Sequence, residues 1–187
     1  MITSDKYRMT FIFTPRTAST ALEKAIIDGD AFARNDSPDH STYRHQDYTA
    51  AKESRWPVYA VLREPNDWLC SLYAMHNHTG GSKLRPQLPV FNNTTGVLGV
   101  KDLLELHTFL NKWYVQPNKC TNQMDWIGDS TVVKYDDLDA FCLVNRIPKL
   151  ERLNASPDHN LSLSYKAQAL ANIIWERDYN AYYTGES

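Results

Sequence analysis

Cysteine is scarce in this sequence, with three residues in a chain of 187. Cys70, Cys120 and Cys142 lie far apart and form no Cys-x-x-Cys pair. The pattern therefore indicates neither a disulfide framework nor a zinc ribbon. Reduced thiols in an intracellular protein are the plain interpretation.

Long apolar runs are also missing. No stretch approaches the roughly 20 apolar residues that a helix needs to span a bilayer. The opening MITSDKYRMTFIF contains an acidic residue and lacks the long apolar run of a signal peptide. We therefore expect a cytoplasmic protein with no membrane partner.

The chain has no excess of either charge, since 20 Lys and Arg residues balance 22 Asp and Glu residues. A general nucleic-acid binder usually shows a strong basic excess, so no nucleic-acid partner is expected. The aromatic content of 12% argues against a disordered chain. The length suits a single domain over residues 1–187.

Predicted strands and helices alternate along the chain. The expected strands are 9–14, 58–62 and 130–135, with a short one near 31–34. The expected helices are 19–27, 65–76, 101–114, one from about 136, and one from Ser162 or Ser164 to about Tyr183. Residues 77–100 are expected to form a long loop. This order indicates an α/β fold with a mainly parallel sheet covered on both faces. Ligands of such sheets bind beyond the carboxyl ends of the strands.

One arginine and several hydroxyl side chains follow the first predicted strand, in the segment Thr14–Thr20. The segment leads into a helix N-terminus, whose N–H groups and partial positive charge suit a phosphate or sulfate. Arg16 adds a positive charge, and Thr17, Ser19 and Thr20 add hydroxyl donors. The segment lacks the two glycines and the lysine of a Walker A loop, which disfavours a kinase or ATPase of that class. An ordinary helix cap explains it equally well.

A second arginine, Arg63, follows the predicted strand 58–62, and Ser71 falls about two turns along the next helix. An arginine fork and a hydroxyl can together hold one phosphate, although a structural salt bridge is the commoner role of such an arginine. The two segments together suit a nucleotide that carries phosphates at both ends.

Four segments in this order resemble motifs of the sulfotransferases that use 3′-phosphoadenosine 5′-phosphosulfate (PAPS). The 5′-phosphosulfate loop of that family is similar to FIFTPRTASTALEKAI, and its 3′-phosphate motif is similar to VLREPNDWLCSLY. A later strand and turn of the family resemble VVKYDDL. The closing loop and terminal helix resemble RLNAS and LSLSYKAQALANIIWERDYNAYY. The likeness is closest to the carbohydrate branch. It implies a three-layer P-loop-like α/β fold, with a central, mainly parallel sheet flanked by helices.

The resemblance also implies a role for each matching residue. Arg16 would stabilise the bridging oxygen as the sulfuryl group leaves, and Arg63 with Ser71 would hold the 3′-phosphate. The implied PAPS-binding residues are Arg16, Thr17, Ala18, Ser19, Thr20, Arg63, Ser71, Arg152, Asn154 and Ser156. No metal is expected, because His76 and His78 have no third ligand beside them.

An acceptor hydroxyl needs a base, which carbohydrate-type relatives commonly place between the first two motifs. We predict His45, because an imidazole titrates near neutral pH. His40, Asp47 and Glu53 are the alternatives.

The sequence departs from the family pattern at three positions. Ala18 replaces a common glycine, which implies a different backbone path or less room in the loop. Glu64 replaces the commoner aspartate, and Trp68 stands where many relatives carry a basic residue. The expected function is transfer of a sulfuryl group from PAPS to a hydroxyl of a saccharide or small metabolite. The alternative is a nucleotide-binding module of the same fold without turnover.

Overall fold

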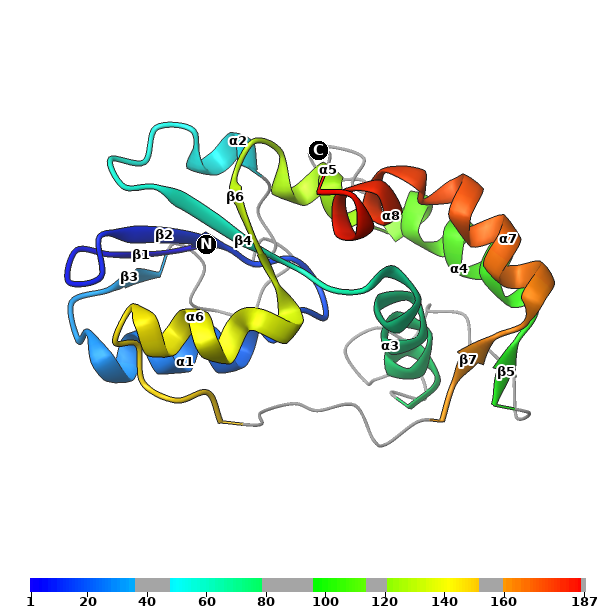
Figure 1. Ribbon diagram of the computed structural model, residues 1–187, viewed down its shortest axis with the longest axis horizontal. Helices are drawn as coiled ribbons and strands as arrows, with labels where there is room; N and C mark the ends of the chain where they lie inside the picture. Colours follow the sequence, from blue (N-terminus) through cyan, green and yellow to red (C-terminus); the bar gives the residue numbers. More distant parts are fainter. Residues whose placement is uncertain (36–47, 79–95, 114–120, 152–159, 186–187) are drawn as a thin grey trace. The chain divides into compact units, whose positions relative to one another are not determined.

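The computed structural model describes residues 1–35, 48–78, 96–113, 121–151 and 160–185 (Figure 1). Its contacts divide the chain into two compact units, one of residues 1–63 and 123–154, the other of residues 64–122 and 155–186. Each unit has a hydrophobic core of its own. The single domain over 1–187 stays a prediction.

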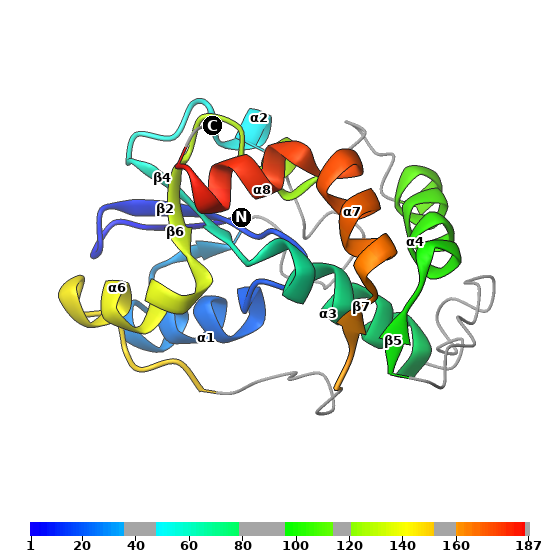
Figure 2. The same cartoon turned by 45° about the vertical axis from the view of Figure 1, so that its right-hand side comes forward.

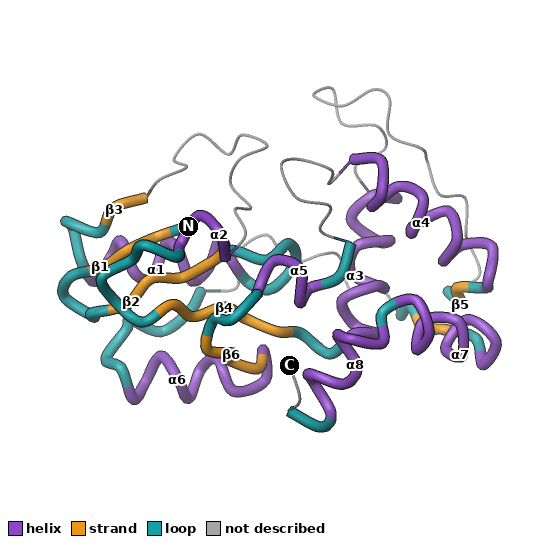
Figure 3. The backbone as a smooth tube through the Cα atoms, turned by 90° about the horizontal axis from the view of Figure 1, so that it is seen from above, coloured by secondary structure: helices purple, strands orange, loops and turns teal. Residues whose placement is uncertain are grey.

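The first unit contains a five-stranded sheet in the order β3-β1-β2-β4-β6, which Figure 3 shows from above. The strands are β1 Ile2–Ser4, β2 Met9–Ile12, β3 Arg34–Asn35, β4 Val58–Leu62 and β6 Thr131–Lys134. β2, β4 and β6 are parallel, but β1 is antiparallel to both of its neighbours. The sheet is therefore mixed, whereas a mainly parallel one was predicted. Residues 5–8 join β1 to β2, a turn too short for a parallel crossover.

Helices cover both faces of this sheet (Figures 1 and 2). α1 Ser19–Gly29 and α6 Leu138–Val144 lie on one face, and the short helices α2 Tyr48–Ala51 and α5 Gln123–Ile127 lie on the other. A short 3₁₀ turn, η1 Tyr135–Asp137, joins β6 to α6. The core under α1 contains Phe11, Leu22, Ile26, Val61 and Val133. The prediction of an α/β chain with a sheet flanked by helices is confirmed.

The second unit is mainly helical. Its elements are α3 Pro65–His78, β5 Val97–Leu98, α4 Val100–Trp113, β7 Ser162–Leu163, α7 Tyr165–Ile174 and α8 Glu176–Tyr183. α4 packs against α7 and α3 against α8, while β5 and β7 pair in parallel. The core includes Trp68, Leu72, Leu103, Leu106 and Trp175, so Trp68 is a packing residue in this unit.

Several predicted boundaries differ from the observed ones. The helix predicted over 19–27 continues through Gly29. Of the two positions predicted to start the last helix, Ser164 is confirmed as its N-cap, because its Oγ accepts from the Ala167 N–H. That helix is interrupted at Trp175, where φ is −112° and ψ is 32°. The predicted loop 77–100 includes the end of α3 and all of β5, and residues 79–95 lie outside the described part.

None of the helices in the described ranges has the length and apolar character that crossing a membrane requires.

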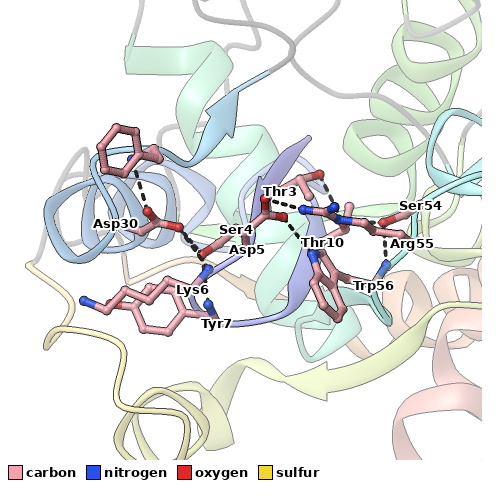
Figure 4. Close-up of polar contacts among 11 residues, drawn as sticks. Thr3, Ser4, Asp5, Lys6, Tyr7, Thr10, Asp30, Ser54, Arg55 and Trp56 are labelled. Carbon is pink, nitrogen blue, oxygen red and sulfur yellow. Dashed lines mark hydrogen bonds and ion pairs between the residues drawn. The ribbon is translucent and has the colours of Figure 1, made fainter.

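Asp30 ends α1 and ties the helix to the hairpin of β1 and β2 (Figure 4). The Ser4 hydroxyl donates to its carboxylate at 2.6 Å, and the Phe32 N–H donates at 3.1 Å. The Lys6 N–H is a third, longer donor at 3.4 Å. These donors, Ser4 foremost, hold the pKa of Asp30 below its ordinary value. The carboxylate therefore gives α1 a defined end that its sequence alone does not show.

Asp30→Asn is expected to lower the free energy of unfolding by about 1–3 kcal/mol at pH 7, because hydrogen bonds to a charged acceptor are lost. The folded pKa is depressed, so this stability is present above the unfolded pKa of about 3.9 and is lost as pH falls through the folded pKa. Urea unfolding at pH 7 and pH 3 should show a smaller difference between variant and wild type at pH 3. Asp28→Asn, at an exposed ion pair with Lys24, should change stability by less than about 0.5 kcal/mol. A pH-independent difference for Asp30→Asn contradicts this account.

Candidate functional site

Three parallel strands end at one edge of the sheet in the first unit. β2 pairs with β4 through Ile12 and Ala60, and β4 pairs with β6 through Leu62 and Lys134. Residues that follow these strands therefore lie at a common carboxyl edge, where ligands of α/β sheets bind. The loop before α1, Arg63 and η1 are the segments at this edge.

The loop before α1 has an unusual backbone. Arg16 has a φ of 63° and Ala18 a φ of 58°, so both are left-handed although neither is glycine. A side chain in this region costs roughly 1–2 kcal/mol, and such strain is concentrated at functional sites. Ala18 thus adopts a conformation that glycine reaches more easily than any residue with a side chain. Alternating left-handed residues turn backbone N–H groups toward a common concavity, which suits an anion.

The first turn of α1 carries no charged side chain. The N-cap of this helix is Ala18, and no side chain of the described residues caps it. The Thr17 hydroxyl donates to the Thr14 carbonyl at 2.8 Å and so braces the loop itself. The buried Oγ1 of Thr14 has no hydrogen-bond partner among the described residues. The first turn therefore sets no acidic side chain against the positive end of the helix dipole.

Arg63 reaches this loop from the end of β4. Its Nη1 donates to the Arg16 carbonyl at 3.2 Å, and its guanidinium lies 5.1 Å from the centre of the Tyr135 ring. Its Nε is buried and has no partner within the described part of the chain. Arg63 forms no ion pair with a described residue, although a salt bridge is the commoner role of an arginine at such a position. Among the described residues, the arginine is therefore held by a carbonyl and a ring and not by a carboxylate.

Gln123 is a member of this edge that the sequence analysis missed. It begins α5, is fully buried, and its side-chain amide bonds both backbone groups of Arg63. No local pattern marks it, because its partner lies 60 residues earlier in the chain.

The other predicted binding residues are placed as follows. Ser19 and Thr20 form the first turn of α1 with their side chains half-buried. Ser71 is buried in α3 of the second unit, so its pairing with Arg63 on one phosphate stays a prediction. Arg152, Asn154 and Ser156, together with the predicted base His45 and its alternatives His40 and Asp47, lie outside the described residues.

Glu53 is described, and it lies at the opposite end of the strands. It lines a cavity of about 500 Å³ together with Thr3 and Ser54. The Ser54 and Thr10 hydroxyls are 2.6 Å apart near the start of β2, as Figure 4 shows. The chain then runs from Glu53 into the amino end of β4, whereas Arg63 follows its carboxyl end. This position argues against Glu53 as the base for a donor bound at Arg16.

Glu64, the second departure from the family pattern, caps α3 within the second unit. Its carboxylate accepts from the Asp67 N–H at 2.8 Å and from the Tyr183 hydroxyl at 2.6 Å. Burial, with the bond to Glu64, raises the pKa of Tyr183 to about 12. Tyr179 donates to Asn66 in the same turn at 2.6 Å. The longer glutamate thus connects the start of α3 to the terminal helix.

No protein-family model, curated protein or solved structure matches this chain.

Among the residues that the structure describes, no three or more His, Cys, Asp and Glu side chains form a group that could hold a metal ion. The side chains of His76 and His78 lie outside the described part. Sulfuryl transfer without a metal stays a prediction.

Proposed function

We propose that the chain is a PAPS-dependent sulfotransferase with a P-loop-like fold, which transfers a sulfuryl group to a hydroxyl of a saccharide or small metabolite. The observation that carries the proposal is the contact of Arg63 with the left-handed loop at Arg16. This contact brings Arg63 to the loop of Arg16 and to the N-terminus of α1 at one sheet edge. The first turn of α1 contains no acidic residue. A dianionic phosphate is the chemistry that such an edge favours.

The residues at the edge fit the implied donor. The buried Nε of Arg63 and Oγ1 of Thr14 are polar atoms without a partner among the described residues, and an anion or its water shell can satisfy both. When bound, PAPS supplies the sulfuryl group, which moves to the acceptor oxygen as its bond to the 5′-phosphate oxygen breaks. Arg16 and the α1 N-terminus hold the negative charge that collects on that phosphate oxygen. The predicted base His45 takes the acceptor proton.

The alternative function, a nucleotide-binding module without turnover, would bind its nucleotide at the same sheet edge. It is favoured by the Thr17 hydroxyl, which donates within the loop to the Thr14 carbonyl and not outward. This alternative predicts binding of the nucleotide without transfer to any acceptor.

Calorimetric titration with adenosine 3′,5′-bisphosphate, the desulfated product, tests the proposal. Wild type should bind it more tightly than ATP–Mg²⁺, and Arg63→Ala should weaken binding roughly 10- to 100-fold, because a charge-assisted contact is lost. Arg34→Ala, on the edge strand β3, is the matched control and should bind as wild type does. Transfer of labelled sulfate to an acceptor library then separates the enzyme from the module.

Two outcomes contradict the proposal. The first is no binding of the bisphosphate at millimolar concentration. The second is tighter binding of ATP–Mg²⁺, which indicates a phosphotransferase.

A further inference from the structure

The Gln123 side chain holds the backbone of Arg63 on both sides. The Arg63 N–H donates to Oε1 of Gln123 at 2.9 Å, and Nε2 of Gln123 donates to the Arg63 carbonyl at 2.9 Å. Gln123 is 0% exposed, so water does not compete for these bonds. The side-chain amide of a glutamine carries an N–H donor and a carbonyl acceptor side by side, much as the N–H and C=O of one residue lie on the same side of an extended strand. Gln123 therefore supplies the pairing that a neighbouring strand residue otherwise makes.

The two hydrogen bonds between Gln123 and Arg63, which we call the clamp, lie where the pairing of β4 with β6 stops. The β4–β6 register ends at Leu62 and Lys134, so Arg63 is one residue beyond the last paired position. Arg63 is also the last residue before the chain leaves the first unit, and Gln123 is the first residue on its return. The amide thus ties the departing chain to the returning chain at the carboxyl edge of the sheet.

The consequence concerns the direction of the Arg63 side chain. An arginine has several rotatable bonds, and its guanidinium is placed accurately only when its backbone is fixed. With both backbone groups held, Nη1 reaches the Arg16 carbonyl and the guanidinium lies over Tyr135. Without the bonds to Gln123, the partly buried N–H and carbonyl of Arg63 lose their partners, and the backbone is free to turn toward water.

We propose that Gln123 is a positioning residue that presents Arg63 to the 3′-phosphate of the nucleotide. The inference rests on the proposed function. Gln123 acts through Arg63 and needs no contact with the ligand. Its effect on nucleotide affinity should therefore disappear when the Arg63 side chain is absent, which a general structural role does not predict.

A double-mutant cycle with adenosine 3′,5′-bisphosphate tests this role. Gln123→Met keeps the volume and removes both bonds, and it should weaken binding about tenfold. In an Arg63→Ala background, the same change should alter the dissociation constant less than about twofold. Gln168→Met, the same replacement on α7, is the matched control and should leave binding unchanged. All titrations are made at a temperature below the thermal unfolding transition of each variant.

A second measurement keeps the inference testable if Gln123→Met does not fold. In wild type, saturating bisphosphate should shift the NMR signals of the Gln123 side-chain amide, and in Arg63→Ala it should not. The role of Gln123 is overturned if Gln123→Met weakens nucleotide binding equally in wild type and in Arg63→Ala. It is also overturned if the Gln123 signals do not shift in a wild type that binds the nucleotide. Neither result contradicts the proposed function. A wild type that binds no bisphosphate overturns the proposed function and this role with it.

Discussion

Arg16→Ala is expected to reduce the rate of sulfuryl transfer about 10²- to 10³-fold, the usual effect of removing a donor that stabilises developing charge. Arg16 lies in the strained loop before α1, with a φ of 63° and its carbonyl held by Arg63. Because the charge develops mainly in the transition state, kcat should fall far more than the affinity for adenosine 3′,5′-bisphosphate. Steady-state kinetics with the best acceptor from the library, combined with calorimetry, measures both quantities.

Arg8→Ala is the matched control for this experiment. Arg8 is also left-handed, with a φ of 54°, but it lies in the turn between β1 and β2, before the amino end of β2. Its removal imposes the same backbone change without touching the carboxyl edge, so kcat should stay within about twofold of wild type. A kcat for Arg16→Ala within threefold of wild type contradicts the catalytic role.

Trp175→Ala is expected to lower the free energy of unfolding by about 3–5 kcal/mol, the range for a buried tryptophan. Trp175 is 0% exposed in the core of the second unit, and its Nε1 donates to the Thr121 carbonyl at 2.9 Å. The His107 ring meets it edge-on, with ring centroids 5.7 Å apart. The truncation therefore leaves a large cavity and a carbonyl without its donor. Urea unfolding followed by circular dichroism measures the loss.

Ile173→Ala, two residues earlier in the chain, is the control, because Ile173 is 75% exposed on α7. We expect a change of less than about 0.5 kcal/mol. A loss below about 1 kcal/mol for Trp175→Ala shows that the second unit does not depend on this side chain.

The elements that the sequence predicted well are those with strong local signals. The run VYAVL forms β4 over Val58–Leu62 as predicted, and the helix predicted over 19–27 forms as α1, with Leu22, Ala25 and Ile26 on its buried face. Ser164, one of the two residues predicted to start the last helix, caps α7. β-branched runs, apolar spacing of three and four residues, and capping hydroxyls act over a few residues, so they are visible in the sequence.

The elements that were missed depend on distant partners. β1 is three residues long and is stabilised by pairing with β2 and β3. α5 carries Gln123, whose partner Arg63 is far away in sequence. The interruption at Trp175 accompanies burial of its indole against Thr121, which periodicity along one helix does not reveal. Such features are decided by tertiary contacts, which override local propensity.

The sequence by itself determined the alternation of strands and helices, the two arginines that follow strands, and the scarcity of cysteine and long apolar runs. Only the tertiary structure decided that the strands of Arg16 and Arg63 are neighbours, that the sheet is mixed, and that Ala18 is left-handed. It also placed Gln123 on Arg63 and Glu53 at the opposite end of the strands. The physical reason is that strand order and side-chain direction arise from long-range pairing and packing, whereas composition and periodicity are local.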